Sequence, residues 1–88
     1  MIIQLHPKFR NAYKKRIFPF SELVSKTEER IKFFKENPRN PVLKDHGLRG
    51  RRSNLRSFSV TGDIRVIYQL VDKDNALFLD IGSHNQVY

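Results

Sequence analysis

The stretch Leu55–Val71, LRSFSVTGDIRVIYQLV, decides how we expect this chain to fold. It holds two runs rich in β-branched and aromatic residues, which favour strands, on either side of Thr61-Gly62-Asp63. Gly62 can adopt the positive φ angle that a tight connection between strands usually requires. The stretch therefore predicts two strands joined by a turn.

Residues in a strand point alternately to its two faces, so the same stretch predicts which side of the sheet is buried. One face of the second strand is entirely apolar and is expected to face the core: Ile64, Val66, Tyr68 and Leu70. Phe58 and Val60 continue this face on the first strand, where Arg56 shares it. Arg65 is then expected on the outer face of a central strand, and Ser57 and Ser59 on the outer face of its neighbour.

The rest of the chain supplies two more strands and two helices. Ile2–Leu5 is predicted to be a short strand, and Ala76–Ser83 a strand that follows the hairpin. Apolar residues at three- and four-residue steps predict a helix over Pro7–Ile17. A second helix is expected to begin with Ser21 as its N-cap and to end at Asn37-Pro38.

This order of elements predicts a single α+β domain over residues 1–88. Two N-terminal helices would pack on one face of a four-stranded, mainly antiparallel, twisted sheet. The connection Pro38–Asn54 is long for a compact domain, and such connections tend to be functional or disordered. The tail Gly82–Tyr88 is expected to end without another helix, which leaves the outer face of the sheet open to a ligand.

Composition points to a polyanionic partner. The 88 residues carry 17 Lys and Arg against 9 Asp and Glu, a formal net charge of +8. The basic residues concentrate in Lys8–Arg16 and Lys44–Arg56, and we expect the first segment to be a second electrostatic surface or the landing site of a protein partner. The chain has no cysteine, no apolar run long enough to span a membrane and no basic-then-apolar leader, so we expect a cytoplasmic protein.

Two of the three histidines are candidates for catalysis. His6 adjoins Pro7 at a strand-to-helix junction, where no catalytic role is expected, whereas His46 lies in the long loop and His84 follows the last strand. Cleavage of RNA by its own 2′-OH needs a base, an acid and a cation, roles that histidine and arginine can fill without a metal. The spacing of His46, Asp63 and His84 matches no metal-binding motif, so no cofactor is expected.

Four blocks of the sequence resemble the toxins of the RelE/ParE superfamily, and most of all their YafQ-like branch in type II toxin–antitoxin systems. The blocks are KDHGLRG (residues 44–50), RSFSV (56–60), GDIRVIY (62–68) and IGSHNQVY (81–88), and the resemblance extends over essentially the whole chain. It implies a metal-independent endoribonuclease, an mRNA interferase that cuts mRNA in the A site of the 70S ribosome and arrests growth. It also implies a cognate antitoxin that neutralises the toxin, and we expect an acidic antitoxin segment that folds on binding.

The resemblance implies a set of catalytic residues. His46 and His84 match the loop and C-terminal histidines of the YafQ branch, and Asp63 matches its turn aspartate. Arg65 matches the arginine that RelE-like members place against the scissile phosphate, and Tyr88 matches a C-terminal aromatic residue proposed to stack on a base or to take part in proton transfer.

A further set of residues is expected to contact RNA: Lys44, Arg49, Arg51, Arg52, Arg56, Ser57 and Ser59. Ser57 and Ser59 depart from the family, because relatives carry lysines at these positions and the YafQ branch has another histidine at the second. Ile64 stands at a position that is aromatic in some members. These departures imply a slower enzyme, or one that relies on His46 and His84 alone.

A second hypothesis is a basic binding module without catalysis, either a gyrase poison of the ParE type or an RNA-binding protein. ParE-like members generally lack the histidine and tyrosine of the tail, so His84 and Tyr88 favour the endoribonuclease.

Overall fold

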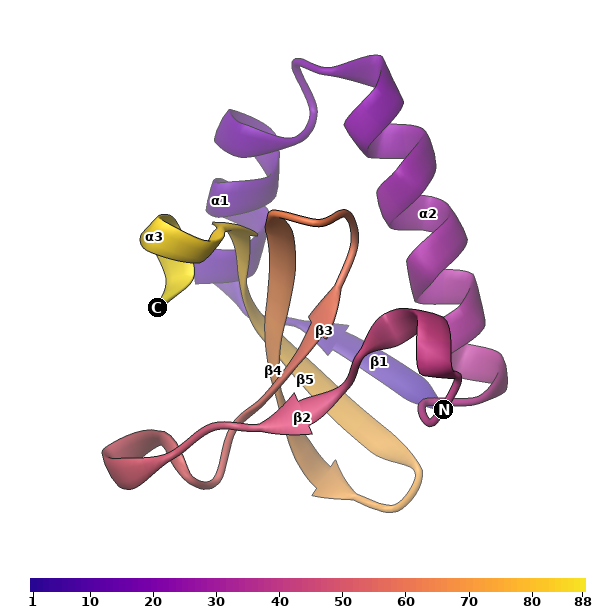
Figure 1. The fold of residues 1–88 in the computed structure, drawn as a ribbon, viewed down its shortest axis with the longest axis vertical. Coiled ribbons are helices and arrows are strands. Elements are labelled where there is room, and N and C mark those ends of the chain that lie inside the picture. The colour runs from indigo at the N-terminus through magenta and orange to yellow at the C-terminus, as the bar shows by residue number, and fades with distance from the viewer.

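The computed structural model describes all 88 residues and has the predicted order of elements (Figure 1). Strand β1 (Ile2–Leu5) leads into helices α1 (Pro7–Arg16) and α2 (Ser21–Glu36). The long connection contains the 3₁₀ turns η1 (Pro41–Leu43) and η2 (Gly50–Arg52), with the short strand β2 (His46–Gly47) between them. Strands β3 (Arg56–Ser59), β4 (Ile64–Asp72) and β5 (Asn75–Ser83) form a meander, and helix α3 (His84–Val87) ends the chain.

The strands form one sheet in the order β1-β5-β4-β3-β2. Only β1 runs parallel to its neighbour, because two helices separate it in sequence from the sheet, while the other pairings are antiparallel. Successive strands of the meander are joined by turns, so their registers follow directly from turn length. The α+β class and the mainly antiparallel sheet are therefore as predicted.

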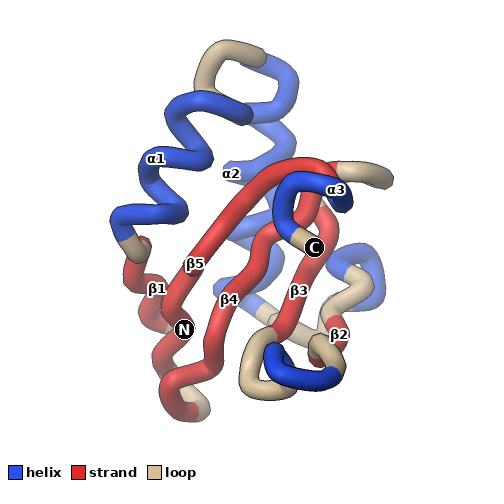
Figure 2. The backbone as a smooth tube through the Cα atoms, turned by 90° about the vertical axis from the view of Figure 1, so that its left-hand side faces the viewer, coloured by secondary structure: helices blue, strands red, loops and turns tan.

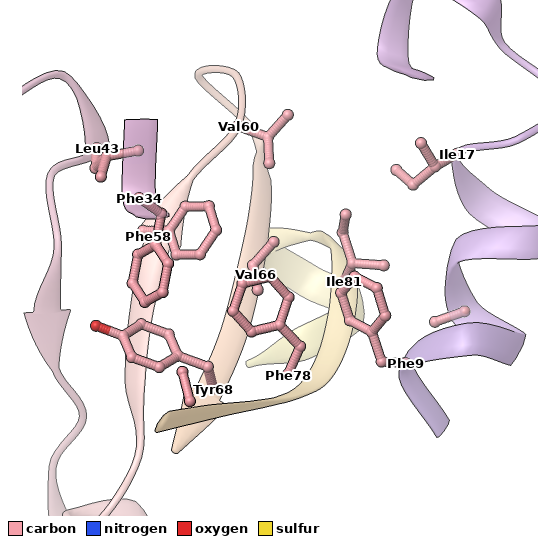
Figure 3. Packing of buried hydrophobic residues seen from close by; sticks show 12 residues of the cluster. Phe9, Ile17, Phe34, Leu43, Phe58, Val60, Val66, Tyr68, Phe78 and Ile81 are labelled. Carbon is pink, nitrogen blue, oxygen red and sulfur yellow. The ribbon is translucent and has the colours of Figure 1, made fainter. Parts of the chain in front are cut away.

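Most of the predicted apolar face of the hairpin lies in the core, but the prediction was wrong for Leu70, which is 43% exposed towards the end of β4. Phe58, Val60, Val66 and Tyr68 are buried in the core. Phe34 of α2 stacks on the ring of Phe58 and meets Tyr68 and Phe78 edge-on, with ring centroids 4.9–5.6 Å apart (Figure 3). Such aromatic contacts add to the hydrophobic stabilisation and fix how α2 lies on the sheet. Phe9 of α1 joins the same cluster through Phe78.

The structure corrects the predicted sheet in two respects. The sheet has five strands rather than four, because His46–Gly47 in the long loop pairs with β3. The tail is also not irregular: residues 84–87 form α3, which Figure 2 shows in front of the sheet, with α2 behind it. The face opposite α2 is therefore partly covered rather than open, and Ser57, Ser59 and Ile67 are buried on it.

Two local predictions were also wrong. Gly62 does not adopt a positive φ angle; the residues that do are Lys44 and Gly50, both in the long loop. The turn is instead closed by the Thr61 hydroxyl, which accepts hydrogen bonds from the backbone N–H groups of Asp63 and Ile64. Ser21 is the first residue of α2 rather than its N-cap, which is Phe20. No helix is both long and apolar enough to cross a bilayer.

Candidate active site

Pairing across the sheet places the predicted site residues on one face. His46 of β2 stands opposite Ser57 of β3, and Ser59 of β3 stands opposite Arg65 of β4. Residues directly opposite each other in an antiparallel pair project from the same face, and residues two apart in a strand share it too. His46, Ser57, Ser59 and Arg65 therefore all belong to the face that α3 partly covers.

Helix α3 brings the C-terminal candidates to this face. Ser83 and Gln86 form a capping box at its start. The backbone N–H of His84 donates to Oδ1 of Asp63 at 3.3 Å, which ties the helix to the β3–β4 turn. At the other end, Nη1 of Arg52 donates to the Val87 carbonyl at 2.9 Å.

His84 and Tyr88 lie one helical turn apart and their rings touch. The centroids are 4.6 Å apart and the rings meet edge-to-face at 63°. The Tyr88 hydroxyl donates a hydrogen bond to Oγ of Ser57, which is the cross-strand partner of His46. Ser57 thus pairs with the loop histidine across the sheet and bonds to Tyr88, which touches the tail histidine, although no hydrogen bond or ring contact joins His46 to His84 directly.

His46 is exposed, and one of its ring nitrogens is engaged. Nδ1 lies 3.0 Å from the carbonyl oxygen of Lys44. A carbonyl only accepts, so Nδ1 carries the proton, and in the neutral ring Nε2 presents its lone pair outward. His6 differs, because its Nδ1 accepts from the Lys8 backbone N–H and caps α1. This is a structural role, in line with the expectation that His6 is not catalytic.

Arg65 is half-buried and held in place by its own hairpin. Nη1 donates to Oγ of Ser59, and Nη2 donates to the Gly62 carbonyl at 3.3 Å. Nε is buried and has no hydrogen-bond partner within the protein. Arg65 forms no ion pair with Asp63 or any other acid, so its charge is available to an anion.

Apart from Arg56, the predicted RNA-contacting residues fall into three groups. Lys44, Arg49 and Arg51 are exposed. Arg52 is partly buried and bonded to α3. Ser57 and Ser59 are buried under Tyr88 and Arg65, so a bound strand would meet those covering side chains first.

Arg56 lies apart from this face. Its Nε and Nη2 both lie 2.7 Å from Oδ1 of Asp45, and Oδ2 of Asp45 accepts from the Tyr68 hydroxyl. The hydrogen bond to Asp45 raises the pKa of Arg56, and burial, followed by the bond to Asp45, raises the pKa of Tyr68. Arg56 therefore ties the long loop to the helix-facing side of the sheet, and the structure does not bring it to the other predicted site residues.

Sequence reasoning missed two features near the site. Asp45 is nearly buried and anchors the segment that carries His46. Lys26 and Arg30 of α2 line a pocket with Arg65. Their spacing of four residues, which puts both cations on one helix face, is the signal that could have found them. No group of three or more His, Asp or Glu side chains converges in a way that could hold a metal ion.

Solved structures of known proteins share the fold of this chain. No family model and no curated protein matches the chain. Among solved structures, YafQ from E. coli strain BL21(DE3) is 24% identical over 98% of this chain and 96% of that chain, with a TM-score of 0.82. YafQ in the E. coli DinJ–YafQ complex gives 24% identity, the same coverage and 0.80. A YoeB/ParE toxin from Agrobacterium tumefaciens gives 17% identity, 96% and 99% coverage, and 0.78. The chain therefore has the RelE-like fold that the sequence blocks implied.

Proposed function

We propose that this chain is the toxin of a type II toxin–antitoxin system, a ribosome-dependent endoribonuclease that cleaves mRNA without a metal. The observation that carries the proposal is that Ser57, the cross-strand partner of His46, is bonded to Tyr88, whose ring touches His84, on the same face as Arg65. It supplies two imidazoles and an unpaired guanidinium, the groups that 2′-OH attack on a phosphodiester requires. The RelE-like fold that YafQ shares supports the same reading.

The reaction would use the two imidazoles in opposite proton roles. Nε2 of His46 takes the proton from the 2′-OH as its oxygen bonds to phosphorus, and His84 gives a proton to the 5′-oxygen as the P–O5′ bond breaks. The products are a 2′,3′-cyclic phosphate and a 5′-hydroxyl, and the charges balance when His46 starts neutral and His84 starts protonated. The lone pair that His46 presents outward favours this assignment.

The other residues stabilise charge and hold geometry. Arg65 carries no ion pair, so its guanidinium can stabilise the phosphorane. Asp63 positions His84 through the backbone at the start of α3. Tyr88 is 42% exposed, so one side of its ring is free to stack on a base while its hydroxyl holds Ser57. Lys44, Arg49 and Arg51 would track phosphates of mRNA or rRNA.

A protein partner belongs to the proposal. YafQ has been solved in complex with the antitoxin DinJ. By analogy, and because of the net charge of +8, we propose an antitoxin with an acidic segment that folds onto this chain in the cytoplasm. Association should then weaken with rising salt, since part of the attraction is electrostatic.

The test is to map mRNA 5′ ends on translating ribosomes after induction of the chain and of His84→Ala. We expect codon-phased cuts with the parent and their loss with His84→Ala, and a folded variant because His84 is exposed. His6→Ala is the matched control and should keep cutting, since the one hydrogen bond of the His6 side chain caps α1. DNA breaks without phased mRNA ends would instead identify a gyrase poison, and undiminished cutting by His84→Ala would exclude the proposed mechanism.

A further inference from the structure

Three more cations gather beside Arg65. Lys26 and Arg30 reach out from α2 and Lys44 from the long loop, and with Arg65 they line a pocket of about 430 Å³ next to the β3–β4 turn. The proposed reaction makes no use of Lys26 or Arg30.

The pocket exists because β2 is so short. It pairs only with Arg56 and Ser57, so the end of β3 at Ser59 lies on the edge of the sheet. Arg30 covers this edge: its Nη1 donates to the Val42 carbonyl at 2.8 Å and to the Ser59 carbonyl at 3.4 Å. Arg65 bonds to the hydroxyl of the same serine, so Ser59 holds both guanidinium groups in place.

Each of these guanidinium groups has one N–H donor that forms no hydrogen bond within the protein. Nε of Arg30 and Nε of Arg65 are buried, and neither has a hydrogen-bond partner in the protein. The one acid that forms an ion pair with the group is Glu29, whose Oε1 is 3.4 Å from Lys26 Nζ and 3.8 Å from Arg30 Nε, the second too long for a hydrogen bond. Four cations line the pocket and Glu29 is the acid paired with them, so the charge of the pocket favours an anion.

We propose that Lys26, Arg30 and Lys44 form, beside Arg65, a subsite for the phosphate of the RNA backbone that neighbours the scissile phosphate on Arg65. The inference rests on the proposed function, because a single strand with one phosphate at the imidazoles must lay its next phosphate beside them. A phosphodiester and a carboxylate each present two charged oxygens to an arginine, so the preference for RNA over an acidic peptide rests on position: Arg65 lines this pocket and also belongs to the proposed catalytic face.

The test measures binding of the protein to a single-stranded RNA carrying 2′-O-methyl groups throughout, which cannot be cleaved by 2′-OH attack. Lys26→Gln should raise Kd about threefold, and should lower the slope of log Kd against log salt by about 0.7, the value for one lost phosphate contact in a single strand. Lys32→Gln is the matched control, because it removes the same charge from the same helix. Lys32 is exposed and does not line the pocket. Lys32→Gln should leave Kd and the slope unchanged.

Arg30→Gln should raise Kd about tenfold, as expected for the loss of one charge-assisted contact. Arg30 also donates to two backbone carbonyls, so the thermal midpoint of unfolding of the Arg30→Gln protein is measured as well. If Arg30→Gln fails to fold, Lys26→Gln still tests the proposal. Equal effects of Lys26→Gln and Lys32→Gln, or no binding of the RNA by the parent, would overturn the subsite. The subsite would also be overturned if Lys26→Gln and Arg30→Gln weakened the binding of a polyglutamate peptide but not the binding of the RNA.

The two proposals fail in different ways. A parent that binds the methylated RNA through Lys26 but produces no phased mRNA ends would refute the endoribonuclease and leave the phosphate subsite standing. A parent that cuts mRNA, with Lys26→Gln cutting and binding equally well, would refute the subsite alone.

Discussion

The phenolic hydroxyl of Tyr88 donates a hydrogen bond to Oγ of Ser57, so residue 88 is held against a buried serine of β3. The two residues are 31 positions apart in sequence. This bond, with the edge-to-face contact between Tyr88 and His84, holds the tail on the face that carries Arg65.

Removing the hydroxyl of Tyr88 distinguishes stacking of its ring on a base from a role of the hydroxyl in proton transfer. Tyr88→Phe removes the bond to Ser57 and keeps the ring against His84, so we expect the free energy of unfolding to fall by about 1 kcal/mol. If Tyr88 acts by stacking, the cleavage rate should fall less in Tyr88→Phe than in Tyr88→Ala. Single-turnover cleavage on stalled ribosomes measures this, and equal losses in both variants would show that the hydroxyl itself takes part in the reaction.

We expect Asp45 to contribute more to the free energy of unfolding than a typical loop residue does. Its side chain is 10% exposed, and it accepts from both Arg56 and Tyr68. Asp45→Ala leaves these two donors unpaired and should lower the free energy of unfolding by about 2–3 kcal/mol in urea titrations. Asp74→Ala is the control, since Asp74 is exposed and its carboxylate bonds to nothing; a loss of equal size there would contradict the argument.

Stability should decline in alkaline solution through Tyr68. Burial and the bond to Asp45 raise the pKa of Tyr68 above its ordinary value in the unfolded chain, about 10. Above that pH the unfolded chain loses the proton while the folded chain keeps it, so the free energy of unfolding decreases as pH rises. Urea titrations at stepped pH should show this decline in the parent and a shallower one in Tyr68→Phe, whose remaining slope comes from other groups.

Phe34 anchors α2 to the sheet through three aromatic contacts and is fully buried. Phe34→Ala should cost about 3–5 kcal/mol, from lost burial and the cavity left behind. Phe34→Leu fills more of the space and should cost clearly less. Chemical denaturation of both variants tests this, and a Phe34→Ala protein as stable as the parent would show that α2 is not held by this side chain.

Local patterns were enough to predict the elements that carry strong periodicity. The alternation in Leu55–Val71 correctly assigned Phe58, Val60, Val66 and Tyr68 to the core, because side-chain direction in a strand depends only on the parity of position. The two helices followed from their apolar spacing in the same way. The loop strand His46–Gly47 and the helix α3 escaped prediction, since elements of two and four residues show no period.

For the candidate site, too, the sequence predicted some features and the fold decided the others. The resemblance of the sequence blocks, together with the residue types, predicted His46, Arg65, His84 and Tyr88 as the groups that would cleave a phosphodiester, and this stays a prediction. Folding alone settled what each of them touches: that Tyr88 reaches Ser57, that Arg56 turns to Asp45, and that Lys26 and Arg30 stand beside Arg65. Contacts between residues far apart in the chain depend on strand register and helix packing, which no local stretch encodes.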